Sequence, residues 1–147
     1  MLRFTLVPWE ELTRDALYDA MVLRQTVFAV EQNCAFLDCD GIDKQAWHVF
    51  GRDADDLVAY ARLVPPGVKY DEPSIGRVVT HPRARGTGAG RALFAACVKE
   101  TRRLFGDRPI RIGAQQYLER FYASFGFVVA GDPYLEDGIP HVEMRLA

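Results

Sequence analysis

Apolar and polar residues alternate in short runs that predict a chain rich in strands. Leu2, Phe4 and Leu6 alternate with polar neighbours, which is the period of a half-buried strand over residues 2–7. A turn at residues 53–56 joins two further strand-like runs as a hairpin. Beyond the first strand, the predicted strands cover residues 47–51, 57–64, 75–80, 110–114, 127–130 and 141–146.

Three other stretches carry apolar residues at helical spacing. Thr13 can cap a helix that continues to about residue 31, and a break inside this stretch stays open. A stripe over residues 93–105 predicts a second helix, and one over residues 118–125 predicts a third. Gly126 follows the third, where a left-handed residue commonly ends a helix. The order of elements predicts an α/β fold (mixed α+β), with helices on both faces of a mixed sheet.

Composition narrows the class of protein. A length of 147 residues fits one domain, residues 1–147. A formal charge of -2 argues against a nucleic-acid partner, which usually selects a basic surface. No window approaches the ~18 apolar residues of a membrane span, so we expect no membrane partner. Three cysteines without a secretory signal predict reduced thiols and a cytoplasmic protein.

A glycine loop offers the clearest candidate chemistry. Residues 85–91 read Arg-Gly-Thr-Gly-Ala-Gly-Arg and lie between a predicted strand and a predicted helix. Backbone N–H groups in such a turn, together with the helix N-terminus, favour a bound phosphate. Arg91 occupies the third glycine position of a dinucleotide fingerprint, and the Lys-Ser/Thr pair of a P-loop is missing. Of the phosphate ligands considered for this loop, the pyrophosphate of coenzyme A is the one left. The alternative is that the loop is a flexible turn that binds no ligand.

These residues resemble the GNAT acetyltransferases. Arg85, Gly88 and Gly90 match the loop pattern Gln/Arg-x-x-Gly-x-Gly/Ala, and residues 78–80 are similar to the family's bulged fourth strand. Residues 121–127 resemble the family's tyrosine helix and the Gly-Phe pair that follows it. A closer resemblance, to the ElaA-type subfamily, rests on Arg24 and on residues 27–32, 76–78, 113–115 and 137–141.

The resemblance implies the GNAT fold, with a mostly antiparallel sheet of about seven strands. It implies acetyl-CoA as cosubstrate, no metal, and direct attack of an amine on the thioester. Tyr122 would donate a hydrogen bond to the departing thiolate, and a backbone N–H near Val79 would stabilise the oxyanion. The implied acetyl-CoA contacts are Val78, Val79, Thr80, Arg85, Gly86, Thr87, Gly88, Ala89, Gly90, Arg91, Gln115 and Tyr122.

The acceptor side is constrained less. Glu31, His48 and His141 are candidates to line it, and these three and His81 are candidates for the general base; each also has an ordinary structural interpretation. The acidic loop over residues 33–45 either attracts a cationic acceptor or forms a solvated surface. We expect a small-molecule or peptide amine as acceptor, and a homodimer is compatible with this fold. A noncatalytic acyl-CoA sensor and a nucleotide-binding module are the alternatives.

Overall fold

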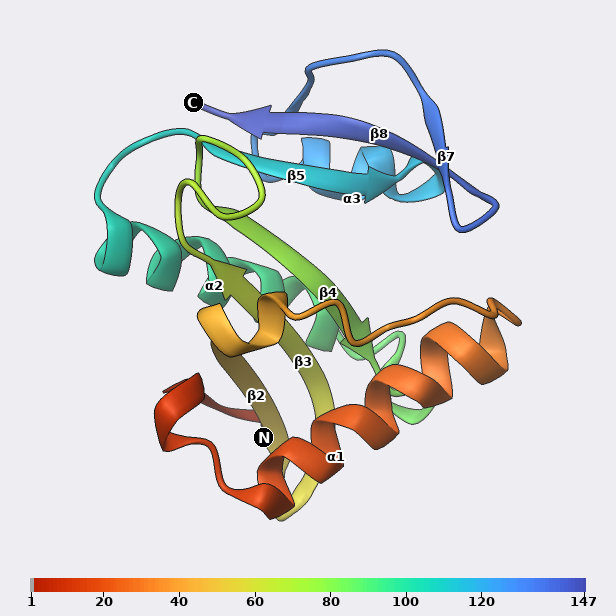
Figure 1. Ribbon diagram of the computed structural model, residues 1–147. Coiled ribbons are helices and arrows are strands. Elements are labelled where there is room, and N and C mark those ends of the chain that lie inside the picture. Colours follow the sequence, from red (N-terminus) through yellow and green to blue (C-terminus); the bar gives the residue numbers. More distant parts are fainter. Residues whose placement is uncertain (1) are drawn as a thin grey trace.

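Figure 1 shows the computed structural model of the protein, which describes residues 2–147. The strands are β1 (Leu2–Pro8), β2 (Trp47–Asp53), β3 (Asp56–Val64), β4 (Ser74–Thr80), β5 (Ile110–Gln115), β6 (Val128–Val129), β7 (Tyr134–Glu136) and β8 (Ile139–Leu146). The α-helices are α1 (Arg14–Arg24), α2 (Ala89–Phe105) and α3 (Glu119–Ala123). A π-helix, η2 (Gln25–Glu31), extends α1, and short 3₁₀ turns are η1 (Trp9–Glu11), η3 (Ile42–Gln45), η4 (Pro82–Ala84) and η5 (Gln116–Leu118).

The strands form two sheets. One has the order β1-β2-β3-β4, and the other has the order β5-β8-β6 with β7 also paired to β8. Every ladder within residues 2–147 is antiparallel. The predicted fold class is confirmed, but the strands divide into two four-stranded sheets where the sequence predicted one sheet of about seven. β7 was missed because three residues are too few to show a period.

The two sheets meet along β4 and β5. The backbone N–H of Arg111 donates to the C=O of Pro73 at 3.1 Å, which holds the beginnings of these two strands together. From there the strands diverge (Figure 1). β4 carries a bulge at this edge: Tyr60 pairs with Val79 but Arg62 pairs with Gly76, which leaves one extra residue on β4. The bulge bends β4 and leaves a gap between the sheets.

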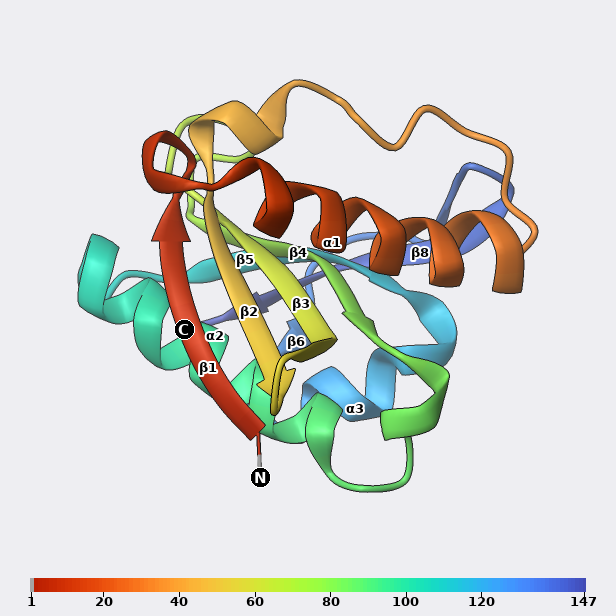
Figure 2. The same cartoon turned by 90° about the horizontal axis from the view of Figure 1, so that it is seen from below.

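Helices cover both faces of the first sheet, as the sequence predicted (Figure 2). On one face, α1 and η2 pack Ala20, Leu23 and Val27 against Phe50 and Tyr60. On the other, α2 packs its apolar stripe into the larger core cluster, which also contains the inner residues of β5 and β8. The core therefore continues from one sheet into the other beneath the gap.

Residues that the sequence marked as helix boundaries have that role in the structure. The Thr13 hydroxyl accepts from the Ala16 N–H at 3.1 Å, which confirms the predicted cap of α1. Gly126 has a φ of +99°, the predicted left-handed residue after α3. The break that the sequence left open inside this stretch is a change of helix type at Gln25, because Gln32 N–H donates to Val27 C=O, five residues back. Within residues 2–147, every helix falls short of what a membrane crossing requires.

Candidate active site

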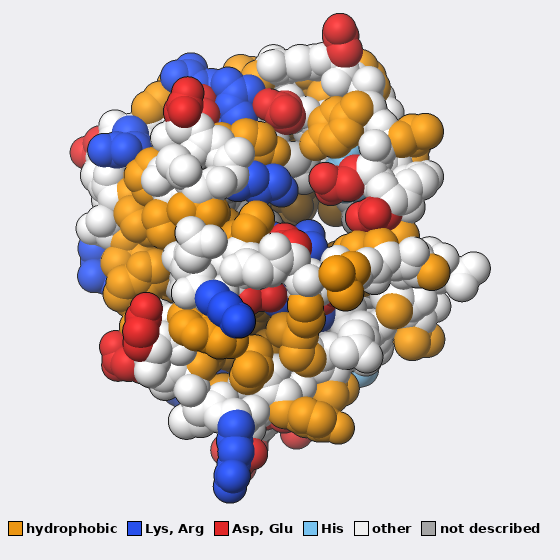
Figure 3. Space-filling model, viewed as in Figure 1, with side chains coloured by type: hydrophobic (Ala, Val, Ile, Leu, Met, Phe, Trp, Pro, Cys, Tyr) orange, Lys and Arg blue, Asp and Glu red, His pale blue; other side chains and the backbone are white. Residues whose placement is uncertain are grey.

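A cavity of about 590 Å³ occupies the gap between β4 and β5. Its walls come from both strands, from η2, from the loop that follows η2, and from the β7–β8 hairpin. The space-filling view shows the hollow, with acidic side chains on its rim (Figure 3). The wide turns of η2 place Val27, Phe28 and Glu31 on the cavity wall. The cavity contains most of the residues that the sequence marked as candidates.

The edge of β4 presents free backbone groups to this cavity. His81 N–H donates to Val58 C=O at 2.7 Å, and Val79 lies opposite Tyr60, so the amides of Val79 and His81 face β3. Hydrogen-bonding direction alternates along a strand, so the amides of Val78 and Thr80 face the gap. The Thr80 C=O indeed accepts from Arg85 Nη2 at 3.2 Å on that side. A ligand in the gap therefore meets the amides that flank Val79.

The glycine loop lies where β4 ends. Gly86 and Gly88 have φ values of +76° and +85°, and a Cβ built on either residue meets nothing within 4 Å. Gly88 caps the 17-residue helix α2 without a side-chain hydrogen bond, so its first-turn N–H groups stay available to an anion. Arg91 donates to Ser124 Oγ at 3.0 Å, which fastens the start of α2 to the segment that follows α3.

The loop residues divide between two hollows. Arg85 lines the main cavity, whereas Thr87, Gly88 and Ala89 line a neighbouring hollow of about 310 Å³. Thr87 Oγ1 donates to Ala84 C=O, which fixes the turn. Gly90 faces β4, where an added Cβ would lie 3.7 Å from Thr80 Cγ2. The loop thus borders the cavity at its β4 end and does not enter it.

Tyr122 lies on the cavity wall at the same end. Its side chain is 7% exposed and packs edge-on against Phe94, with ring centroids 5.0 Å apart. Among residues 2–147 its hydroxyl has no hydrogen-bond partner, so it is free to donate to a ligand. Burial raises the pKa of Tyr122 well above its usual value, because the phenolate would lose its hydration. The group is therefore suited to donate a hydrogen bond and unsuited to lose its proton.

Gln115 contributes a buried polar atom without a partner. Its Nε2 donates to Gln32 Oε1 at 3.3 Å, which ties the end of β5 to the residue after η2. Its Oε1 is buried and accepts no hydrogen bond within the described chain. A buried carbonyl oxygen of this kind favours a ligand N–H. The free β4 amides, the open glycines and this acceptor fit the amide-rich pantetheine arm and pyrophosphate of coenzyme A.

Glu31 is held by Arg85. The guanidinium donates from Nη1 to Oε2 at 2.5 Å and from Nη2 to Oε1 at 2.6 Å, so the pair is bidentate. This hydrogen-bonded arginine lowers the pKa of Glu31. A carboxylate with a lowered pKa accepts a proton less readily, so the arrangement does not favour Glu31 as general base.

His141 reaches the cavity from β8. Nδ1 lies 2.7 Å from the Ile139 C=O, which can only accept, so Nδ1 carries the proton and Nε2 carries the lone pair. The carboxylate of Glu136 lies 3.5 Å from Nε2, and the ring of Tyr134 packs at a centroid distance of 5.8 Å. The side chain is 7% exposed. This is the geometry of a base whose cationic form would have a carboxylate partner.

His48 does not reach the cavity, so the expectation that it lines the acceptor site is corrected. It is 1% exposed within the sheet layer. Nε2 donates to Asp43 C=O at 2.9 Å, which leaves Nδ1 to accept from the Tyr60 hydroxyl at 2.6 Å. Burial lowers the pKa of His48. Side chains alternate along β2, and His48 lies on the inward-facing side of that strand. Both of its ring nitrogens have partners there, so its role is structural.

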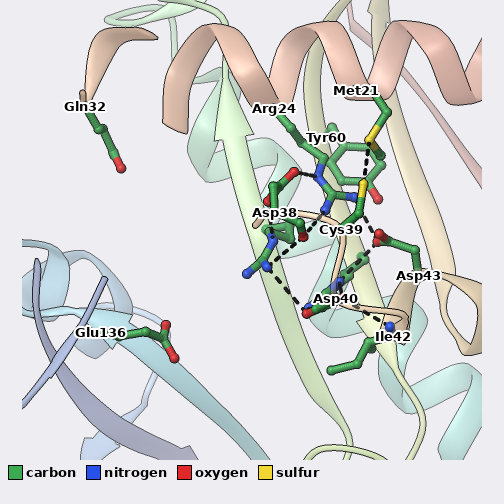
Figure 4. Close-up of polar contacts among 12 residues, drawn as sticks. Met21, Arg24, Gln32, Asp38, Cys39, Asp40, Ile42, Asp43, Tyr60 and Glu136 are labelled. Atoms are coloured by element: carbon green, nitrogen blue, oxygen red, sulfur yellow. Dashed lines mark hydrogen bonds and ion pairs between the residues drawn. The ribbon is translucent and has the colours of Figure 1, made fainter. Parts of the chain in front are cut away.

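The acidic loop forms neither of the two surfaces that the sequence suggested. Its carboxylates are paired with arginines from the body of the fold (Figure 4). Arg24 Nε and Nη1 reach Asp38 and Asp43 at 2.8 Å each. The other pairs are Arg62 with Asp40 and Asp43, and Arg77 with Asp38 and Asp40. We call these six residues the Arg–Asp network; it fastens the loop that roofs the cavity.

Sequence reasoning missed several residues of the cavity wall. Gln32, Lys69, Glu136 and Asp137 all line it. Each lies in or beside an irregular segment, where no periodicity reports which way a side chain points. The one available signal was the family resemblance, because Gln32 and Asp137 lie inside two of the stretches that carry it and Glu136 lies beside one of them.

Comparison with known proteins gives a consistent picture. A family model described as the acetyltransferase (GNAT) domain matches residues 38–147. A UPF0039 protein of Synechocystis is 49% identical over 137 residues, which are 92% of this chain and 89% of that protein. Protein ElaA of Escherichia coli is 40% identical over 136 residues, which are 91% of this chain and 89% of ElaA.

Solved structures extend the similarity to three dimensions. The crystal structure of an acyl-CoA N-acyltransferase from Pseudomonas aeruginosa has a TM-score of 0.94 and 37% sequence identity, over the whole of both chains. The crystal structure of E. coli ElaA has a TM-score of 0.93 and 36% identity, again over the whole of both chains. The overall fold is therefore shared with these proteins.

Proposed function

Because the chain belongs to the GNAT acetyltransferase family, within its ElaA-like group, we propose that it transfers an acetyl group from acetyl-CoA to an amine. The observation that carries the proposal is the meeting, in one cavity, of free β4 amides with the Tyr122 hydroxyl. The glycine loop adjoins the same end of that cavity. The name of the Pseudomonas relative, an acyl-CoA N-acyltransferase, supports the choice of donor.

On the donor side, the thioester lies along β4 with its carbonyl toward the amides that face the gap. Val78 and Thr80 provide these amides, and Val79 positions them through its pairing with β3. They stabilise negative charge on the carbonyl oxygen as the amine attacks. Arg85 and the first turn of α2 hold the pyrophosphate, and Gln115 Oε1 accepts from the pantetheine arm.

Tyr122 stabilises the departing thiolate. When the carbon–sulfur bond breaks, the electron pair stays on sulfur, and the Tyr122 hydroxyl donates a hydrogen bond to it. Complete proton transfer is unfavourable, because a free thiol has a pKa near 8.5 whereas burial raises the pKa of Tyr122. The thiolate therefore takes its proton from solvent after release.

On the acceptor side, His141 removes the proton. An ammonium cannot attack until it loses a proton, and His141 Nε2 carries the lone pair on the cavity side. The resulting imidazolium is held by Glu136 and by the Ile139 C=O. The acceptor nitrogen then forms its bond to the carbonyl carbon as a neutral amine, and it releases its second proton to solvent as the carbon–sulfur bond breaks, which balances the proton that the thiolate takes up. Positioning of the two substrates supplies much of the rate, since no covalent enzyme intermediate is needed.

The test is a panel of amine acceptors with acetyl-CoA, followed by thiol release and by mass analysis of the product. The proposal expects release that depends on the amine, and an acceptor heavier by one acetyl group. Thermal protection by CoA without turnover of any amine would favour a noncatalytic sensor. Thermal protection by ATP or NAD but not by CoA would rule out acetyl-CoA as the donor.

A further inference from the structure

The cavity contains one cation that its surroundings leave unpaired. Four basic residues line it: Arg62, Lys69, Arg77 and Arg85. The three arginines each pair with a carboxylate, at distances between 2.5 and 3.4 Å. Lys69 makes no ion pair with any residue in the range 2–147. Its ammonium can therefore pair with an acidic group of a ligand without breaking an existing ion pair.

The loop that carries Lys69 is held in place by specific contacts. Gly67 N–H donates to Tyr70 C=O at 2.7 Å, which closes the turn before β4. The Lys69 ammonium lies 5.5 Å from the centroid of the Tyr70 ring, within cation–π range. The hydroxyl groups of Tyr70 and Tyr134 meet over Gly113, where an added Cβ would lie 3.3 and 2.8 Å from them. Gly113 thus lets this loop dock across the second sheet.

Lys69 lies at the acceptor end of the cavity. The glycine loop follows the last residue of β4, whereas Lys69 precedes its first residue. A strand of seven residues spans roughly 20 Å at about 3.3 Å per residue, so the two ends of β4 are well separated. An acyl donor that enters beside Arg85 leaves the region near Lys69 for the acceptor.

An acidic group lines the same cavity as Lys69 and does not pair with it. The negative charge of Glu136 acts on the Lys69 ammonium, yet the two form no ion pair in the described chain. Glu136 instead lies 3.5 Å from His141 Nε2. The cavity wall therefore carries a positive and a negative group that do not pair with each other. This pattern is complementary to a ligand that carries a carboxylate and an ammonium.

We propose that Lys69 binds a carboxylate of the acceptor, so that the substrate class is an amino acid or another amine that also carries a carboxylate. The acceptor ammonium then lies toward Glu136 and His141, where it is deprotonated, and its carboxylate lies on Lys69. This inference rests on the proposed function. A hydrogen bond to a charged group raises the affinity for a ligand by roughly 10- to 100-fold. Because Lys69 is exposed, we expect a gain at the lower end of this range.

The test compares a panel of amino acids, each matched with its carboxamide, in kcat/KM with acetyl-CoA. Wild type should favour the carboxylate over the amide by about tenfold. Lys69→Gln should abolish that preference while the values for the amides stay unchanged, and Lys69→Arg should retain part of it. Lys99→Gln, which removes a lysine on the outer face of α2, is the matched control and should behave as wild type.

A binding measurement separates this inference from the proposed function. N-acetylated amino acids and their carboxamides are titrated calorimetrically into wild type and Lys69→Gln, with CoA present. The same preference should appear there, whether or not turnover is seen. Equal binding of acid and amide by wild type, or a preference that survives Lys69→Gln, would overturn the inference. It is also overturned if Lys69→Gln instead lowers the rate with succinyl-CoA and a neutral amine, because the carboxylate would then belong to the donor.

Discussion

Replacing Arg24 by methionine should destabilise the protein far more than replacing an exposed arginine. The Arg24 side chain is fully buried, and its guanidinium donates to Asp38 and Asp43. Loss of one partner from a buried ion pair costs about 3–5 kcal/mol, because the remaining charge stays desolvated. Asp43 keeps Arg62 at 3.1 Å and Asp38 keeps Arg77 at 2.8 Å. The expected loss therefore lies at the lower end, about 3 kcal/mol in the free energy of unfolding.

The change is measured by urea unfolding, followed through the fluorescence of Trp9 and Trp47. For a chain of this size, about 3 kcal/mol corresponds to a decrease in Tm of roughly 6–12 °C. Arg103→Met is the matched control. Arg103 pairs with Glu100 at 2.6 Å on the surface of α2, where its side chain is 60% exposed, so its loss should cost less than about 0.5 kcal/mol. If the two variants unfolded within about 0.5 kcal/mol of each other, the reasoning about the buried network would be wrong.

Three further predictions concern the reaction and the acid stability. Tyr122→Phe should lower turnover ~10–100-fold with little change in acetyl-CoA affinity, because only the hydrogen bond to the leaving thiolate is lost; unchanged turnover, with chemistry limiting, would contradict this. His141→Gln should lower kcat/KM by about 10²-fold near neutral pH, and the deficit should shrink at pH values where the acceptor is already a free amine; a deficit independent of pH would indicate a positioning role instead. Burial alone would raise the pKa of Asp40 and Asp43, but the guanidinium groups of Arg62 and Arg24 outweigh it and the net pKa of both carboxyls is lowered. The network's contribution should therefore be complete above the usual carboxyl pKa near 4 and be lost as the pH falls below it. Urea midpoints between pH 6 and pH 3 should drop more steeply for wild type than for Arg24→Met.

The regular elements were predictable because their residues repeat with the period of the element. The stripe of α2 and the alternation in β1 each report one buried face, and the structure confirms both. The division of the sheet had no such signal. It depends on the register shift in β4, and a bulge changes neither composition nor the apparent period of a strand of seven residues.

The part of the candidate site that the backbone forms was predictable from the sequence. Gly86 and Gly88 require positive φ, and only a glycine-rich loop reports that need in sequence. The rest of the cavity wall and the loop over it depend on side chains brought together from distant positions. Arg24 and Asp43 are 19 residues apart, and Cys34 donates to the C=O of Asp137 across 103 residues. Pairings of this kind follow from the tertiary fold, and no local pattern in one sequence reports them.

Arg77 links the two halves of the site. It is the bulge residue of β4, with a φ of +49°, a conformation that costs a non-glycine residue roughly 1–2 kcal/mol. Its guanidinium offsets that cost: Nε lies 2.8 Å from Asp38 Oδ1, and Nη2 donates to the Asp38 C=O at 3.0 Å. The same guanidinium lies 5.7 Å from the centroid of Phe36, which lines the cavity. The amide of the next residue, Val78, faces the gap between the sheets, where we propose that the thioester binds. One side chain therefore contacts both the bulge of β4 and the loop over the cavity, so a substitution at Arg77 should disturb both walls.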